Sequence, residues 1–236
     1  MYGTNWYQCK RPDGMKGKKP VIATGRAETG RPELSLRERV LKAAFAVFRK
    51  RGFSGASTLE IATRAKVSKR DLYALFGSKQ AILAACIKGR AARMRQPLEL
   101  SAPVPKSSAA VAATLVEFGR SILAVVSHPD VLTVHRLAIA ESDRAPEIAR
   151  TLDRNGREAN HVALADWLAK TQAQGLMGAG DPAVMAAHFL ALLWGGLLTQ
   201  LLLRVRDAPS AEEIEARADA ATRALLTLYP PARRAQ

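Results

Sequence analysis

The sequence is poor in the residues that form disulfides, metal sites and catalytic centres. Its 236 residues include two cysteines and four histidines, and Cys9 and Cys86 form no CxxC pair and no metal-ligand spacing. No GxSxG, HExxH or phosphate-loop motif occurs, so an enzyme would have no nucleophile, metal or general base. We therefore expect no catalytic residue, no metal and no cofactor, and a chain without disulfides agrees with a cytoplasmic location.

Acidic residues are scarce in the first part of the chain. Residues 1–95 contain 22 Lys and Arg against 6 Asp and Glu, a formal charge of +16, whereas residues 96–236 contain 14 against 15, a charge of −1. Such a positive surplus attracts a polyanion such as nucleic acid or an acidic membrane. Because the surplus is confined to the first part, we expect polyanion binding there and a different task for the second part.

Alternating strand patterns are missing, and apolar residues recur at helical spacing, so the expected fold class is all-α. Capping boxes predict three helix starts, at Ser35, Ser57 and Ser68. The first helix is expected to end at Gly52 in a Schellman motif, and the third to bury Leu72, Tyr73 and Phe76. A fourth helix is expected from Lys79 to about Arg95.

The second part of the chain is expected to consist of helices alone. Residues 97–107, PLELSAPVPKS, predict a connection, and helices are expected at 108–127, 130–142, 146–174, 182–206 and 211–228. Gly195-Gly196 inside the fourth of these predicts close contact with another helix.

One apolar run, residues 183–205, is long enough to span a membrane. His188, Thr199 and Gln200 inside it, and the lack of a second such segment, argue against a span. We therefore expect no membrane contact, and a membrane-associated protein is kept as an alternative.

Two short helices joined by the turn Ala65-Lys66-Val67, with Lys69 and Arg70 at the start of the second, are typical of a helix-turn-helix. The stretches RERVLKAAFAVFRKRGF and TLEIATRAKVSKRDLYALFGSKQAIL resemble the DNA-binding signature of the TetR family, and RLAIAESDRAPEIAR resembles its AefR-like branch. The resemblance implies an N-terminal three-helix helix-turn-helix DNA-binding domain, residues 35–95. It also implies a C-terminal helical domain for effector binding and dimerisation, residues 96–236.

The resemblance also assigns DNA contacts. It places Ser68, Lys69 and Arg70 at the leading edge of the recognition helix, makes Tyr73 an aromatic that faces the DNA backbone, and adds phosphate contacts from Ser57, Thr58 and Lys79. A helix N-terminus suits a phosphate, which agrees with the position of Lys79. Two alternatives stay open: Lys69 and Arg70 form only a solvated face, or Tyr73 is a core aromatic.

Three positions depart from the family pattern, which usually has Gly at Lys66, Thr or Ser at Asp71, and an aromatic or His at Leu75. Lys66 is strained if the turn needs positive φ. Asp71 fits the capping box and could also accept from a cytosine N4. These departures concern base preference and leave the fold assignment intact.

Residues 1–34 are rich in Gly, Pro, Lys and Arg without helical period, which predicts a flexible basic arm, and Met15 is an alternative translation start. Gly30-Arg31-Pro32 resembles the core of a minor-groove hook, in which Arg31 would enter the groove. The alternative is a tail without sequence specificity.

The resemblance implies that the last two helices form a four-helix homodimer interface, which Leu198→Glu would test if Leu198 faces it. It further implies that the middle helices enclose a pocket for an unknown small-molecule effector. Six candidate pocket residues, each also interpretable as plain core, are Phe118, His135, Trp167, Met177, His188 and Trp194.

The expected function is a repressor that an effector releases from a palindromic operator in double-stranded DNA. A nonspecific nucleic-acid-binding protein and a membrane-associated regulator are the alternatives.

Overall fold

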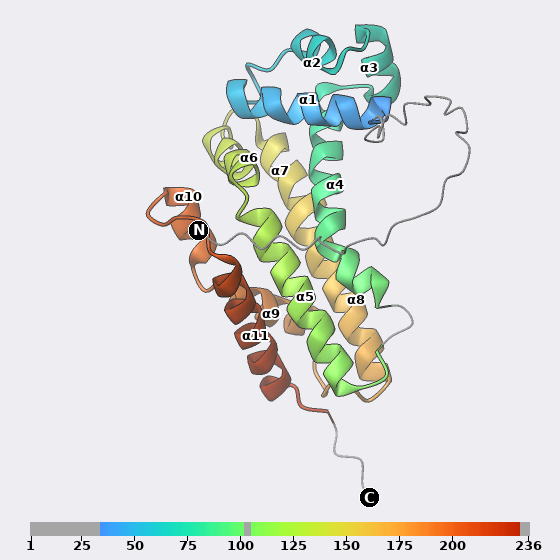
Figure 1. Cartoon of the computed structure of the whole chain (residues 1–236), viewed down its shortest axis with the longest axis vertical. Coiled ribbons are helices and arrows are strands. Elements are labelled where there is room, and N and C mark those ends of the chain that lie inside the picture. Colours follow the sequence, from blue (N-terminus) through green and yellow to red (C-terminus); the bar gives the residue numbers. More distant parts are fainter. Residues whose placement is uncertain (1–33, 102–104, 232–236) are drawn as a thin grey trace, which may run out of the picture. The chain divides into compact units, whose positions relative to one another are not determined.

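The computed structural model describes residues 34–101 and 105–231, and every regular element in these ranges is a helix (Figure 1). The predicted all-α fold is thus confirmed. The first four helices are α1 (Leu36–Arg51), α2 (Thr58–Ala65), α3 (Lys69–Phe76) and α4 (Lys79–Leu100). The others are α5 (Ser108–Val126), α6 (Pro129–Ala140), α7 (Pro146–Leu152), α8 (Ala159–Ala173), α9 (Pro182–Trp194), α10 (Leu197–Leu203) and α11 (Ala211–Leu228).

Serine caps start the first three helices, although two of the predicted capping boxes are incomplete. At α1 the box is present, because Ser35 Oγ accepts from the Glu38 amide at 3.2 Å and the Glu38 carboxylate accepts from the Ser35 amide at 2.9 Å. At α2 Ser57 Oγ accepts from the Leu59 amide at 3.1 Å, while Glu60 lies 3.9 Å from Arg51. The local sequence therefore determines where these helices begin, but it does not determine every hydrogen-bond partner of the capping groups.

Gly52 ends α1 in a way that differs from the predicted Schellman motif. Its φ of 71° is left-handed, but its ψ of 179° is extended, and its amide donates to the Phe48 carbonyl at 2.9 Å. The extended ψ directs the chain straight into the loop toward α2 instead of folding it back over the last turn.

α4 continues through Pro97, where the sequence predicts a connection. Proline has no N–H, so the Arg93 carbonyl one turn earlier loses its helical donor. Ser121 Oγ in α5 donates to that carbonyl at 3.1 Å. The prediction of a break after Arg95 is wrong because a neighbouring helix supplies the missing hydrogen bond.

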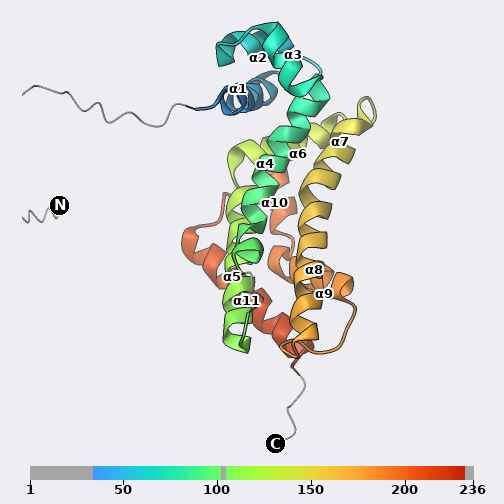
Figure 2. The ribbon, with the colours of Figure 1, turned by 90° about the vertical axis from the view of Figure 1, so that its right-hand side faces the viewer.

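Two clusters of buried side chains form the core, and Figures 1 and 2 show the arrangement of the helices that carry them. The first joins α1–α4, with Phe48 and Leu72 at its centre, to Val134 of α6 and Ile148 of α7. The second is made by α4–α6 and α8–α11, and includes Phe189. Helices α1–α3, the three-helix unit, therefore pack against helices from the second part of the chain. A rearrangement of those helices can reach α1–α3 through the packed side chains.

Residues 146–173 form one nearly continuous helical segment, as the sequence predicts, with a π-helical turn at Asp153–Glu158. An extra residue per turn bulges the backbone, and such turns occur frequently at functional sites. Here Asp153, Gly156 and Arg157 of the turn line the large cavity described below.

Gly195 and Gly196 separate α9 from α10, which are bent by 51°, so the prediction of one helix over 182–206 is wrong. Both glycines have left-handed φ, 46° and 87°, which favours glycine. Within the chain, no atom beyond the neighbouring residues lies nearer than 3.9 Å to a Cβ built at either position, and both glycines are exposed, so the predicted close helix contact stays a prediction for the dimer. A close approach occurs instead at Gly119, where a Cβ would lie 3.1 Å from Leu193 Cδ1.

Two stretches of the described residues are apolar and long enough to cross a membrane: α5, with a mean hydropathy of 1.7, and α9 with α10 taken together. The expectation that only residues 183–205 qualify is therefore wrong. Core helices of globular proteins meet the same criteria, and α5 fully buries Val111, Leu115 and Phe118 in the second cluster.

Candidate DNA-binding surface and effector cavity

The recognition helix α3 exposes nearly all of its side chains. Leu72 is its one fully buried residue, and Ser68, Lys69 and Arg70 are exposed at its first turn. Residues 34–95 carry 15 Lys and Arg against 3 Asp and Glu, so the surroundings of this turn are strongly basic. An exposed, positively charged helix start is what insertion into a DNA groove requires.

Tyr73 joins α3 to the start of α2. Its hydroxyl lies 3.2 Å from Thr58 Oγ1, and its ring centre lies 5.9 Å from Lys69 Nζ. The residue is 41% exposed, so the expectation that Tyr73 is buried on α3 is wrong, and the alternative of a packed core aromatic is excluded. Tyr73 and Thr58 therefore present two neighbouring hydroxyls on the surface beside Ser57, which is also exposed.

The three departures from the family pattern have separate structural accounts. Lys66 has φ 56° and ψ 49°, so the turn does need the left-handed conformation that glycine adopts easily. The Asp71 carboxylate accepts from the Ser68 hydroxyl at 2.7 Å, whereas the sequence predicted the Ser68 amide as its donor. Leu75 is an exposed apolar side chain on α3.

Lys79 has partners within the protein that the sequence did not predict. Its Nζ donates to the carbonyl oxygens of Phe53 at 2.8 Å and Ala56 at 3.1 Å, and lies 4.5 Å from the centre of the Phe53 ring. Lys79 thus fixes the loop that leads into α2. A phosphate contact by Lys79 stays a prediction, and it would use the N–H that these two carbonyls leave free. Arg31 lies outside the described residues.

A cavity of about 720 Å³ extends between the three-helix unit and the second part of the chain. Its wall is mainly apolar, with side chains from α1, α4–α8 and the α9–α10 pair, including Phe45, Ile87, Met94, Ile122, Val134, Leu190 and Leu198. Its volume and apolar wall match those of small-molecule sites in proteins. Leu198 faces this cavity, so Leu198→Glu does not probe the dimer interface as the sequence suggested.

The structure places two of the six candidate pocket residues, His135 and Trp194, in the cavity wall. The other four candidates lie elsewhere. Phe118 stacks on Phe189 in the core, Met177 is buried there too, and Trp167 donates to Ser101 Oγ at 2.8 Å. The exposed His188 lies 2.8 Å from the Tyr229 hydroxyl. These four side chains therefore do not line this cavity, because three of them pack in the core and His188 lies on an exposed face of α9.

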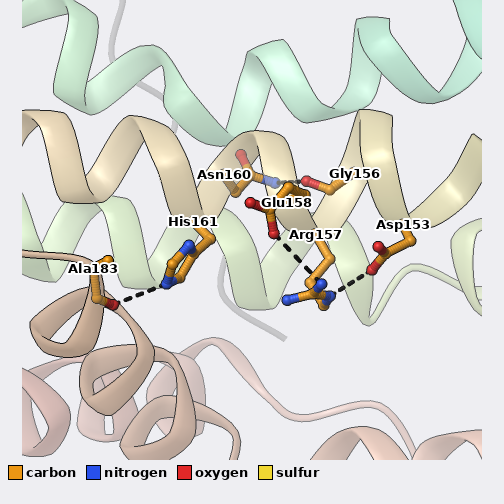
Figure 3. A network of polar contacts seen from close by, with 7 residues as sticks. All are labelled: Asp153, Gly156, Arg157, Glu158, Asn160, His161 and Ala183. Atoms are coloured by element: carbon orange, nitrogen blue, oxygen red, sulfur yellow. Dashed lines mark hydrogen bonds and ion pairs between the residues drawn. The ribbon is translucent and has the colours of Figure 1, made fainter.

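The polar groups of the cavity wall gather on α4, α6 and the π-helical turn with α8. Burial lowers the pKa of His135, against the effect of its hydrogen bond to the Val131 carbonyl, so the ring is neutral at pH 7. Arg157 pairs with Asp153 at 2.5 Å, and His161 is hydrogen-bonded to the Ala183 carbonyl at 2.9 Å. Figure 3 shows both contacts.

Sequence reasoning missed the charged and amide groups of the wall, Arg90 and Asn160. Arg90 lies on α4, which the sequence presents as part of the DNA-binding domain, and Asn160 follows the π-helical turn. A 3.6-residue period continued through Pro97 would have extended α4, but no local signal places Arg90 against Phe45 in the cavity wall.

No group of three or more potential metal-binding side chains exists among the described residues. Burial raises the pKa of the Cys86 thiol to about 12, and the Arg90 charge opposes this only in part. Cys86 is therefore a thiol at neutral pH and not a nucleophilic thiolate.

Two family models match the chain. One, described as bacterial regulatory proteins of the tetR family, matches residues 40–86, and the other, described as AefR-like transcriptional repressor, C-terminal domain, matches residues 113–231. No curated protein matches the chain.

Solved structures resemble the chain over most of its length. The flavonoid-responsive regulator FrrA is 33% identical, over 85% of this chain and 98% of that one, with a TM-score of 0.63. A TetR transcriptional regulator from Agrobacterium tumefaciens is 27% identical, over 83% and 95% of the two chains, with a TM-score of 0.67. The chain therefore belongs to the TetR family of DNA-binding transcriptional regulators and carries an AefR-like C-terminal domain.

Proposed function

We propose that this protein is a homodimeric repressor that holds a palindromic DNA operator and leaves it when a small-molecule effector binds. The observation that carries the proposal is the exposed start of α3, where Ser68, Lys69 and Arg70 project from a short helix braced by α2. Residues 35–95 then form the DNA-binding domain and residues 96–236 the effector-binding and dimerisation domain.

The DNA contacts divide by chemistry. Lys69 and Arg70 read base edges in the major groove, while Ser57, Thr58 and Tyr73 donate to phosphates. The basic arm of residues 1–34 adds affinity through its charge, and Arg31 enters the minor groove. We place the protein in the cytoplasm, without enzymatic activity or a cofactor.

The proposed dimer forms through α9 and α11. On α9 Val184, His188 and Leu192 are exposed and recur at helical spacing on one face. Alanines such as Ala216 on the exposed face of α11 allow close helix packing. Burial of these faces in a four-helix contact would hold two recognition helices about 34–36 Å apart, the spacing of successive major grooves.

The effector acts through the cavity. Phe45 of α1 and Ile87 of α4 share its wall with α5–α10, so one ligand would touch both parts of the chain. A ligand that fits one spacing of the recognition helices better than another shifts the population away from the DNA-bound form. FrrA, named as flavonoid-responsive, supports a small-molecule effector here.

Sequencing of the genomic DNA that crosslinks to the protein tests the proposal. We expect a palindrome with half-sites one helical turn apart, bound at least ~1,000-fold more tightly than random DNA at physiological salt. A ratio near one would replace the proposal with nonspecific nucleic-acid binding. Recovery of the protein in the membrane fraction would favour a membrane-associated regulator.

Arg70→Ala tests the base-reading role on the DNA so identified. We expect a loss of roughly 1–3 kcal/mol on the operator and relaxed preference at one position of each half-site, because a bidentate contact to guanine is removed. Band-shift titrations on operator and random DNA measure both effects. Equal losses on the two DNAs would assign Arg70 to the phosphate backbone.

A further inference from the structure

The cavity combines a mainly apolar wall with a positive charge that has no counter-ion. Arg90 lines the cavity, and its guanidinium carbon lies 3.5 Å from the centre of the Phe45 ring. Among residues 34–101 and 105–231, no carboxylate lies within ion-pair distance of Arg90: Asp130 is bound by Arg49 at 2.6 Å, and Asp153 by Arg157 at 2.5 Å.

Arg90 has lost part of its hydration without gaining an ion-pair partner among the described residues, and the carboxylate of Asp130 acts on it only from beyond ion-pair distance. Burial lowers the pKa of the guanidinium, although this group keeps its charge at neutral pH. The face of Phe45 compensates in part by a cation–π contact, but it accepts none of the five N–H groups in a directed hydrogen bond. A planar anion placed in the cavity would accept two of them at once.

A second residue of the cavity wall, Asn160, has a buried polar atom without a hydrogen-bond partner. Asn160 is 5% exposed, and its Nδ2 donates to the Gly156 carbonyl at 2.9 Å and lies 3.2 Å from Met94 Sδ. Its Oδ1 is buried without a donor, and Figure 3 shows this oxygen pointing away from Gly156. An unpaired buried acceptor is costly, which favours a ligand, or the water that it displaces, as the missing partner.

We infer that the cavity binds an organic anion with a mainly apolar body, whose carboxylate, sulfonate or phenolate group pairs with Arg90. The inference rests on the proposed function where it calls this anion the effector. Pairing draws the guanidinium off the Phe45 ring, and Phe45 belongs to α1 of the three-helix unit. The charge of the ligand is thereby sensed where the cavity meets the DNA-binding part of the chain.

A matched pair of fluorescent probes tests the charge requirement: 1-anilinonaphthalene-8-sulfonate, and N-phenyl-1-naphthylamine, which lacks the sulfonate. We expect the full chain to bind the sulfonate probe, and Arg90→Gln to weaken that binding ~10-fold or more while it changes binding of the neutral probe less than about 3-fold. Arg90→Lys should restore most of the difference, because it returns the charge.

Arg93→Gln is the matched control, since Arg93 lies on the same helix but is exposed and outside the cavity wall. It should leave both probes unaffected. Thermal melting of each variant verifies folding. No binding of the sulfonate probe, equal weakening of both probes by Arg90→Gln, or an equal loss in Arg93→Gln would overturn the inference.

Binding to the operator DNA that the crosslinking experiment identifies is measured separately. It distinguishes this inference from the proposed function. If Arg90→Gln weakens binding of the sulfonate probe but no anion changes the affinity for DNA, the inferred ligand class stands and the proposed release from DNA by an effector is overturned. If a neutral ligand releases the protein from DNA and Arg90→Gln leaves that release intact, the proposed regulatory function stands and the inference of an anionic ligand is overturned.

Discussion

Lys66 occupies a backbone conformation that its side chain disfavours. The left-handed conformation costs a residue with a Cβ roughly 1–2 kcal/mol of free energy. Lys66 adopts this conformation, with φ 56° and ψ 49°. Lys66→Gly removes this strain, offset by about 0.4–1 kcal/mol of added flexibility in the unfolded chain. We expect the free energy of unfolding to rise by up to about 1 kcal/mol in urea titrations. Lys66→Ala keeps the strain, so an equal gain in that variant would contradict the account.

Lys79 is expected to affect both stability and DNA binding. Lys79→Met keeps the stem but leaves the carbonyls of Phe53 and Ala56 without their donor. We expect a loss of about 1–2 kcal/mol in the free energy of unfolding, together with weaker binding to all DNA sequences alike. The exposed Lys50 provides the control Lys50→Met, which should leave the melting temperature unchanged. A stable Lys79→Met protein with weakened DNA binding would make Lys79 a phosphate ligand only.

Among helices, the continuation of α4 through Pro97 depends on Ser121. Ser121→Ala should cost about 0.5–1.5 kcal/mol, because the Arg93 carbonyl loses its hydrogen bond. In a Pro97→Ala background the helix supplies its own donor, so Ser121→Ala should then cost clearly less. A double-mutant cycle by chemical denaturation measures this coupling. Additive effects would show that Ser121 does not compensate for the proline.

Helix starts could be predicted from the sequence, whereas several helix ends and bends could not. Ser35, Ser57 and Ser68 each accept from an amide within three residues, so a few letters of sequence contain the whole interaction. The fate of Pro97 depends on Ser121, which is distant in the chain. Gly195-Gly196 is compatible with either an unbroken helix or a bend at left-handed φ, and only the tertiary structure decides between them.

For the molecule as a whole, the family motif predicted the exposure of residues on α3 better than the composition of the cavity wall. Lys69 and Arg70 are exposed where the motif places them, because a helix-turn-helix is a local structure. The cavity wall is assembled from α1, α4–α8 and the α9–α10 pair, so residue type alone cannot separate Trp194, which lines it, from Trp167, which does not. Arg90 was missed because its burial comes from helices far away in sequence.

Dimerisation is the property of the whole molecule on which operator recognition depends, since a palindrome needs two linked recognition helices. Leu192 is 43% exposed on the proposed face of α9, and Leu192→Glu would place an unpaired charge in the buried contact. We expect this variant to elute as a monomer with native helicity, and to lose most of its preference for the operator. Leu100→Glu, at a leucine that is 74% exposed on α4, should remain dimeric. Light scattering at micromolar concentration decides the matter: a dimeric Leu192→Glu protein would move the interface away from α9, and a monomeric wild-type protein with full operator affinity would remove the dimer from the mechanism.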